Sequence, residues 1–311
     1  MLAVMVLKEQ GLDLLGVSFA TPFFGPEPGI EAGVKTGIPV RAVDIGERHL
    51  AMLKNPRYGY GSQMNPCIDC HALMLRVAGE MMEEEGADFL FTGEVLGQRP
   101  MSQRRDALRS VEKTSGVEGR ILRPLSALLL PETLVEREGL VIRERLLDIK
   151  GQGRKRQMAL AARYGIEDYP QPGGGCMLTK EGFANRLRHL LAVFPESTTR
   201  EVELLKWGRQ FFLTGGSRLV VGRNRKDNGV LLDLARPDDV VLDIPGFRGP
   251  VALVAATELV ESDLPAAAAV LVSYCDAALG QAVAVRWNHN GREGNMETVK
   301  GTRDNEIATM I

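Results

Sequence analysis

The chain has 311 residues, of which 44% are hydrophobic and 25% charged, and a formal net charge of −2 at pH 7. Because a single hydrophobic core rarely serves more than about 250 to 300 residues, we expect two or three domains. The balanced charge excludes a uniformly basic nucleic-acid-binding protein, so any RNA surface must be a local patch of Lys and Arg. The apolar runs are shorter than the ~20 residues that span a bilayer and no signal peptide is evident, so we expect a cytoplasmic protein.

Predicted helices and strands alternate over about the first 125 residues. Helices are expected at 1–10, 30–34, 46–53 and 65–86, and strands at 14–19, 38–45 and 88–91. Such alternation is typical of the α/β class and predicts a Rossmann-like, doubly wound parallel sheet. A strand normally precedes the first helix of this fold, whereas here the first predicted helix begins at Met1.

The pattern becomes irregular after about residue 122 and changes again after Pro195. A basic run at 150–156 and a Pro/Gly-rich loop at 170–176 lead to a predicted helix at 179–193. Short strands are then expected at 211–213, 219–221, 230–232, 240–242 and 251–254. We therefore predict three regions: an α/β domain at 1–125, a helical extension at 126–200 and a mixed α+β domain at 205–311.

Three of the four cysteines form a candidate reactive site. Cys67 and Cys70 are one turn apart at the predicted start of a helix, where Asn65 would cap the helix and Pro66 would occupy its first position. The helix dipole favours the thiolate there, which is the form needed for metal ligation or sulfur chemistry. Cys176 lies far along the chain, in the glycine-rich loop, and we expect the three sulfurs to converge.

Three converging cysteines suit an iron–sulfur cluster with one iron left open, or a persulfide-bearing pair with a third, assisting thiol. A Cys-x-x-Cys pair alone is also typical of half a structural zinc site or of a thioredoxin-like pair. His71 would be a further zinc ligand, but its adjacency to Cys70 predicts that it points to a different face of the helix. Cys275 has the surroundings of an ordinary buried thiol.

Four short motifs then follow one another in a characteristic order. They are Asn-Pro-Cys-Ile-Asp-Cys at 65–70, Thr-Gly-Glu-Val-Leu-Gly-Gln at 92–98, Ser-Gln at 102–103 and Arg-Pro-Leu at 123–125. Together they resemble the PP-loop tRNA thiouridine synthases, most closely 4-thiouridine synthase and its relatives, over about residues 1–194. The resemblance implies an ATP-dependent tRNA sulfurtransferase whose nucleotide-binding domain lies at 1–125.

The resemblance also implies a nucleotide site at the C-terminal edge of the sheet, where open α/β sheets bind ligands. ATP would adenylate a uridine carbonyl oxygen, with Mg²⁺ between its phosphates, and sulfur would then displace AMP. Polar residues at such positions also commonly cap helices or face solvent. The implied nucleotide-binding residues are Thr92, Gly93, Glu94, Gln98, Ser102 and Gln103.

The implied chemistry further requires a source of sulfur and an RNA. Cys67, Cys70 and Cys176 would either ligate a 4Fe-4S cluster, whose open iron carries a hydrosulfide, or carry sulfur as a persulfide. The expected partners are tRNA and a sulfur donor, either a cysteine desulfurase or sulfide.

In this family a Ser-Gly-Gly-x-Asp-Ser loop precedes the first helix and holds the ATP pyrophosphate. No such sequence occurs in residues 1–311. We expect either a true start upstream of Met1 or a degenerate homologue, and favour the first because the remaining motifs are intact. As given, the chain is expected to be inactive for lack of this loop.

Residues 215–228 resemble the RNA-binding domain of the NFACT type, with Val-Gly-Arg-Asn at 221–224 and Asp-Asn at 227–228. The resemblance predicts phosphate binding by a local cationic cluster. A solvated hairpin with ordinary surface arginines is the alternative. A non-catalytic RNA-binding protein derived from a PP-loop enzyme is the second function considered, since it would keep these cations and tolerate a missing ATP site. The cluster consists of Arg218, Arg223, Arg225 and Lys226.

Overall fold

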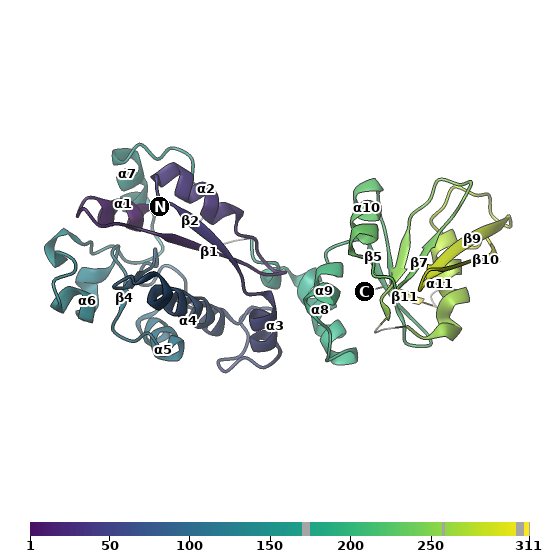
Figure 1. Cartoon of the computed structure of the whole chain (residues 1–311), viewed down its shortest axis with the longest axis horizontal. Coiled ribbons are helices and arrows are strands. Elements are labelled where there is room, and N and C mark those ends of the chain that lie inside the picture. Colours follow the sequence, from purple (N-terminus) through teal and green to yellow (C-terminus); the bar gives the residue numbers. More distant parts are fainter. Residues whose placement is uncertain (170–174, 257–258, 303–307, 311) are drawn as a thin grey trace. The chain divides into compact units, whose positions relative to one another are not determined.

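The computed structural model describes residues 1–169, 175–256, 259–302 and 308–310, and the chain divides into two compact units, 1–180 and 181–311 (Figure 1). The sequence grouped the helix at 179–193 with the preceding extension, whereas the structure includes that helix in the second unit. No helix within the described ranges has the length and apolar character needed to cross a bilayer.

The first unit begins with a helix and one pair of parallel strands. Helix α1 (Leu2–Lys8) is followed by β1 (Gly16–Ala20), α2 (Glu27–Thr36), β2 (Val40–Asp44) and α3 (Gly46–Lys54). β1 and β2 pair in parallel, with Gly16 opposite Val40 and Ala20 opposite Asp44. Gly37 ends α2 in the left-handed conformation, at a φ of 63°, which lets the chain turn directly towards β2.

A second pair of parallel strands follows the cysteine helix. Helix α4 (Cys67–Glu85) leads to β3 (Leu90–Phe91), α5 (Arg105–Ser115) and β4 (Ile121–Leu122), and β3 pairs in parallel with β4. The remainder of the unit contains only short elements. They are η1 (Ala127–Leu129), α6 (Leu134–Arg137), η2 (Arg143–Arg145), α7 (Lys155–Arg163) and η3 (Met177–Thr179).

Helix α4 packs against both strand pairs. Leu73 lies in an apolar cluster with Phe19 of β1, whereas Leu75 lies in a cluster with Ile121 of β4. Leu73 and Leu75 reach different clusters because residues two apart in a helix lie about 160° apart around its axis. Burying each of these leucines stabilises the fold by roughly 1.5–3 kcal/mol.

Helix α1 also joins the two strand pairs, because Leu7 shares a buried cluster with Leu14, just before β1, and with Leu122 of β4. The strands nevertheless form two separate two-stranded sheets in the described residues. The α/β class is therefore confirmed, but a continuous doubly wound sheet is not present. The physical reason is that, among the described residues, no strand forms backbone hydrogen bonds with both β1 and β3.

The second unit contains a seven-stranded sheet whose neighbouring strands are all antiparallel, in the order β10-β9-β7-β8-β6-β5-β11. Its helices in the described residues are α8 (Glu181–Val193), α9 (Thr199–Leu204), α10 (Arg225–Leu234) and α11 (Leu264–Val272), and the 3₁₀ turn η5 (Glu261–Asp263) precedes α11. Its strands are β5 (Arg209–Leu213), β6 (Arg218–Val221), β7 (Val240–Asp243), β8 (Ala252–Val254), β9 (Ala282–His289), β10 (Arg292–Val299) and β11 (Ala308–Met310).

Both faces of this sheet are covered, because side chains alternate along its strands. Leu219 and Val221 of β6 lie in the same cluster as Leu271 of α11. Val220, between them, lies in the opposite cluster with Leu231 of α10. A continuous apolar run is what a strand buried on both faces requires.

The strand predicted at 230–232 is wrong, because these residues belong to α10. Asn224 caps this helix, since its side-chain oxygen accepts a hydrogen bond from the backbone N–H of Asp227 at 2.9 Å. Leu231 is fully buried in the helix. A run of three apolar residues fits one turn of a helix as well as a short strand, and here the cap decides between them.

Candidate functional site

The two clustered cysteines lie at the start of α4, as the sequence predicted. The predicted cap is wrong, because Pro66 occupies the cap position and Asn65 makes no side-chain cap bond. The side-chain amide of Asn65 instead donates a hydrogen bond to Sγ of Cys67 at 3.2 Å. The residue expected to begin the helix thus contacts the sulfur directly.

Cys176 reaches the same region from the end of the first unit. The backbone N–H of Met177 donates to the Phe23 carbonyl at 3.0 Å, and the N–H of Met64 donates to the Leu178 carbonyl at 3.3 Å. Burial raises the pKa of the Cys70 thiol, and the charges of Cys176 and Cys67 raise it further. The two backbone hydrogen bonds place the residues after Cys176 beside Phe23 and Met64, the latter three residues before Cys67. Residues 170–174 of the predicted loop lie outside the described residues.

His49 is a site residue that the sequence did not indicate. Its ring is fully buried in α3, and Nε2 lies 3.3 Å from Sγ of Cys70. The rings of Phe23 and Phe24 pack against it, and burial lowers the pKa of His49 to about 4. The imidazole is therefore neutral at neutral pH. Within the described residues its Nδ1 has no hydrogen-bond partner.

The positions of the His, Cys, Asp and Glu side chains bear on the predicted metal site. Among the described residues, no three or more His, Cys, Asp or Glu side chains are arranged to hold a metal ion. As they lie, Cys67, Cys70 and Cys176 do not form the ligand set of a cluster. The cluster and the metal-ligating role of the cysteines stay predictions.

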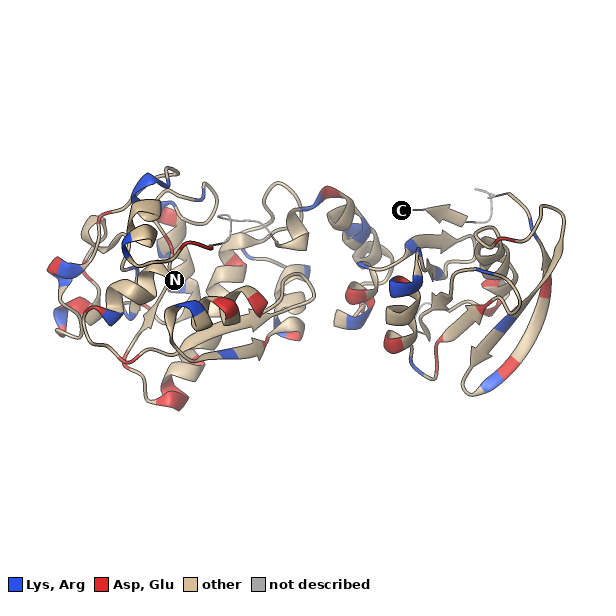
Figure 2. Cartoon of the chain, turned by 90° about the horizontal axis from the view of Figure 1, so that it is seen from above, with Lys and Arg blue, Asp and Glu red and all other residues tan. Residues whose placement is uncertain are grey.

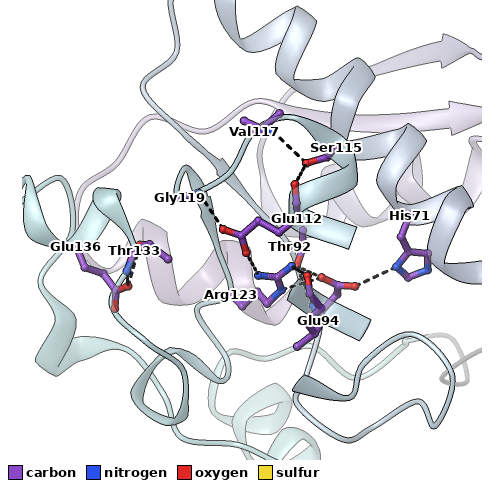
Figure 3. Close-up of polar contacts among 11 residues, drawn as sticks. His71, Thr92, Glu94, Glu112, Ser115, Val117, Gly119, Arg123, Thr133 and Glu136 are labelled. Carbon is purple, nitrogen blue, oxygen red and sulfur yellow. Dashed lines mark hydrogen bonds and ion pairs between the residues drawn. The ribbon is translucent and has the colours of Figure 1, made fainter. Parts of the chain in front are cut away.

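A buried network of polar side chains lies beyond β3 (Figure 3). Glu94 lies between His71, whose Nδ1 is 3.0 Å from Oε1, and Arg123, whose Nε donates to Oε2 at 3.0 Å. Arg123 also donates to Glu112 at 3.1 Å. Burial would raise the pKa of Glu94, but the hydrogen bond from His71 and the charge of Arg123 outweigh it and hold the pKa at about 2. Glu94 is thus a buried, ionised carboxylate.

The other predicted nucleotide-binding residues have different surroundings. The Thr92 hydroxyl donates to Glu94 at 3.1 Å, and no atom lies within 4 Å of a Cβ built on Gly93. The Gln98 amide donates to Gln157 of α7 at 3.0 Å. Ser102 and Gln103 are both buried. The predicted residues therefore divide between the Glu94 network, α7 and the interior of the unit.

Gln103 offers an unused acceptor. Its side-chain oxygen Oε1 is buried and, within the described ranges, has no hydrogen-bond donor. A buried acceptor without a donor costs about 1–3 kcal/mol, so an N–H group of a ligand would be favourable there. The amino group of an adenine is a donor of that kind. This orphaned oxygen is the feature of the predicted nucleotide site that fits ATP.

The predicted RNA-binding cations do not form one surface. Arg218 is fully buried, and both of its terminal nitrogens donate to the Glu201 carbonyl at 3.2 Å. Arg223 is exposed and forms an ion pair with Asp227 at 2.6 Å. The other two cations, Arg225 and Lys226, lie in the first turn of α10. Arg218 thus stabilises the interior of the unit, and three of the four cations are exposed.

An aromatic ring accompanies these exposed cations. The Lys226 ammonium lies 5.6 Å from the ring centroid of Trp207, which is within the range of a cation–π interaction. In the view of Figure 2, Lys and Arg alternate with Asp and Glu along the described ribbon of each unit. Three of the four predicted RNA-binding cations therefore lie together at the beginning of α10.

Comparison with known protein families gives a match within the second unit, and the class of the matching family is that of RNA-binding domains. Specifically, residues 208–311 match the family model described as the NFACT protein RNA binding domain. No curated protein matches the chain. A solved structure of the C-terminal part of the fibronectin/fibrinogen-binding protein from Streptococcus suis is 12% identical and covers 84% of this chain and 98% of that one. Its TM-score of 0.27 is too low to indicate a shared overall fold.

Proposed function

We propose that the chain binds tRNA through its second unit and transfers sulfur to a uridine through its first, as an ATP-dependent tRNA sulfurtransferase. The observation that carries this proposal is that Cys176, far away in the sequence, lies in the region of Cys67 and Cys70. Hydrogen bonds join the residues after Cys176 to Met64 and Phe23, and Phe23 packs on His49, which contacts Cys70. Converging thiols without a disulfide suit sulfur carriage, and all three are free. The family match at 208–311 supports RNA as the substrate.

RNA binding is assigned to the exposed cations at the beginning of α10. Arg223, Arg225 and Lys226 lie at the beginning of a helix, where the helix dipole favours an anion such as phosphate, although the N–H groups of Arg223 and Asp227 are already bonded to Asp227 and Asn224. Trp207 beside Lys226 adds an aromatic surface of the kind on which bases stack. The proposal extends to Thr92, Glu94, Gln98, Ser102 and Gln103 as the lining of the nucleotide site.

The sulfur transfer is proposed to proceed through a persulfide. ATP, with Mg²⁺ on its phosphates, supplies the adenylyl group that makes the uracil carbonyl oxygen a good leaving group. The outer sulfur of a cysteine persulfide attacks the activated carbon, and AMP leaves. A second cysteine thiolate attacks the inner sulfur, which breaks the S–S bond, releases thiouridine and leaves a Cys–Cys disulfide. An external thiol then reduces that disulfide.

We further propose that the two strand pairs are halves of one doubly wound parallel sheet. α4 packs against both pairs, and α1 packs against β4 and the residues just before β1, which is expected of helices that cover a continuous sheet. One further strand between β1 and β3 would pair with both free edges. In such a sheet, Thr92 and Glu94 would lie at the carboxyl end of a strand, where open α/β sheets bind ligands.

Sulfur loading tests the proposal without requiring the ATP step. The reduced protein is incubated with cysteine and a cysteine desulfurase, and each cysteine is mapped by mass spectrometry. We expect a persulfide on Cys67, Cys70 or Cys176 and none on Cys275. Serine variants of the three should lose the sulfur, and C275S, the matched control, should retain it. Persulfide on none of the three, with tRNA binding unchanged, would favour the non-catalytic RNA-binding protein.

A further inference from the structure

The loop between α3 and α4 leads directly into the cysteine helix (Figure 1). It begins with a turn, in which the Gly59 N–H donates to the Pro56 carbonyl at 3.4 Å and Gly59 has a φ of 71°. Such a turn leaves the N–H groups of its two central residues without a partner inside the turn. Here the buried Asp69 carboxylate accepts both of them, from Arg57 at 3.1 Å and from Tyr58 at 2.9 Å.

The beginning of α4 holds this loop at two points. Asp69 lies between the two clustered cysteines in the first turn of the helix. The Asn65 side chain accepts a hydrogen bond from the Gln63 N–H at 3.2 Å and donates one to Sγ of Cys67 at the same distance. What the loop presents to solvent is therefore presented next to the sulfurs.

The loop exposes two tyrosine rings. Tyr58 is 40% and Tyr60 42% exposed, and in the described ranges they are the two aromatic members of the exposed large apolar side chains. Their hydroxyls are bonded within the protein, that of Tyr58 to Oγ1 of Thr114 at 3.1 Å and that of Tyr60 to the Leu53 carbonyl at 2.7 Å. The accessible part of each side chain is thus aromatic surface, and little rotational freedom remains to be lost on binding.

Two exposed cations accompany the rings. The Arg57 guanidinium lies 5.6 Å from the ring centroid of Tyr58, and Lys54 ends α3 just before the loop. In the described part of the chain, neither cation forms an ion pair with a carboxylate. Cations beside aromatic surface match a strand that carries phosphates and unstacked bases, which is single-stranded nucleic acid. The family match at 208–311 favours RNA as that strand.

We propose that Tyr58 and Tyr60 stack bases of a single-stranded RNA segment that carries the target uridine, and that the neighbouring cations bind its phosphates. The inference rests on the proposed sulfur transfer, which requires an RNA strand at Cys67. It adds that the nucleotides around this uridine are unpaired when they bind. Every base has a π face, so the loop holds the strand without reading its sequence. Loss of both rings should weaken binding of a single strand by at least about tenfold.

Photo-cross-linking tests where the strand lies. The reduced full chain is mixed with a short oligouridylate that carries one 5-iodouracil, irradiated and digested for mass spectrometry. We expect cross-links on Tyr58 or Tyr60, and none there when the same strand is paired with oligoadenylate, because the bases of a duplex are already stacked on one another. Cross-links confined to the second unit, or an equal yield from the duplex, would overturn the proposal.

Affinity separates stacking from general stability. Binding of a fluorescent oligouridylate is measured by anisotropy in a chain that also carries Arg223→Ala and Arg225→Ala, which weaken the other RNA site. Tyr58→Ala with Tyr60→Ala should lose the tenfold, and the two single alanine variants are used if that pair does not fold. The two tyrosines changed to Phe, the matched control, keep both rings and should bind within about twofold of the parent. Equal losses in the alanine and phenylalanine pairs would overturn the proposal.

Neither readout requires ATP or a persulfide. A chain that stacks the single strand but loads no sulfur would refute the sulfurtransferase and leave the stacking surface standing. The alternative occupant of the loop is the protein that donates sulfur. An alanine pair that binds the strand like the parent, but no longer accepts sulfur from the cysteine desulfurase, would overturn stacking in favour of that partner.

Discussion

Glu94 is the residue on which the polar site depends. It is buried, yet His71, Arg123 and Thr92 all contact its two oxygens. A buried charge is tolerated only when it is paired and hydrogen-bonded, and removing one partner of such a pair typically costs about 3–5 kcal/mol. The same contacts that make the charge tolerable also orient the histidine.

This ionisation predicts how stability depends on pH. The pKa of Glu94 is about 2 in the folded protein, below its ordinary value of 4.5. A carboxyl group whose pKa is lower in the folded than in the unfolded protein stabilises the fold when it is ionised. This contribution to the free energy of unfolding is about 3 kcal/mol; it is complete above about pH 4.5 and is lost as the pH falls through about 2. Urea unfolding at pH 7 and pH 3 should show a smaller acid loss in Glu94→Gln than in the parent. Glu118→Gln, at an exposed position, should behave as the parent, and identical profiles for all three would contradict the prediction.

Single residues were predictable from the sequence where a motif named them. Cys67 and Glu94 belong to short motifs, and Arg123 was quoted within one although its contact with Glu94 was not foreseen. His49 carries no sequence signal, because a lone histidine in an amphipathic helix resembles any other. Arg218 was assigned to the surface, since neighbouring cations suggested a patch, but strand position rather than composition determines that it is buried.

At the scale of elements, helix α10 lies within the segment that matches the family model and carries exposed cations. Asn224 caps it, and Arg225 and Lys226 begin it, so two cations lie at the end of the helix whose dipole favours an anion. The apolar run inside it was taken for a strand because three residues do not distinguish a period of 2 from one of 3.6. The longer alternation at 1–90 was predicted with the correct element types, helped by helices such as α4, which spans several helical periods.

The exposed arginines at α10 predict the salt dependence of RNA binding. Replacing Arg223 and Arg225 together with Ala should weaken tRNA binding and reduce the slope of log affinity against log salt, because each phosphate contact contributes about one to it. The slope is measured by filter binding or anisotropy over a range of salt. Arg248→Ala, in an exposed loop of the same unit, is the matched control. A double variant with the slope of the parent would favour ordinary solvated arginines.

At the scale of the molecule, the first unit has two parallel strand pairs and the second has one antiparallel sheet. The sequence predicted the α/β class of the first and mixed character of the second. It did not predict the strand order of the seven-stranded sheet, because the hydrophobic periodicity of a segment does not indicate which distant segment it pairs with. β11, at the end of the described residues, pairs with β5 across most of the unit's sequence.

The separated strand pairs predict the effect of an added strand. A chain extended before Met1 by a strand and a Ser-Gly-Gly-x-Asp-Ser loop should unfold at a higher temperature, because the free edges of β1 and β3 gain backbone hydrogen bonds. It should also form thiouridine in tRNA with ATP, since the loop supplies donors for the pyrophosphate. The extended chain with the loop Asp changed to Ala should keep the thermal gain and lose the activity; equal activity from residues 1–311 would refute the prediction.

The segment that matches the family model is shorter than the segment whose buried hydrogen bonds hold the second unit together. The family match begins at residue 208, but buried Arg218 donates to the Glu201 carbonyl and the Gln210 amide donates to the Leu204 carbonyl at 2.9 Å. A fragment trimmed to the match would remove these acceptors, and each buried donor left without one costs about 1–3 kcal/mol. The smallest piece able to stand alone therefore includes α9, seven or more residues ahead of where sequence similarity alone would cut.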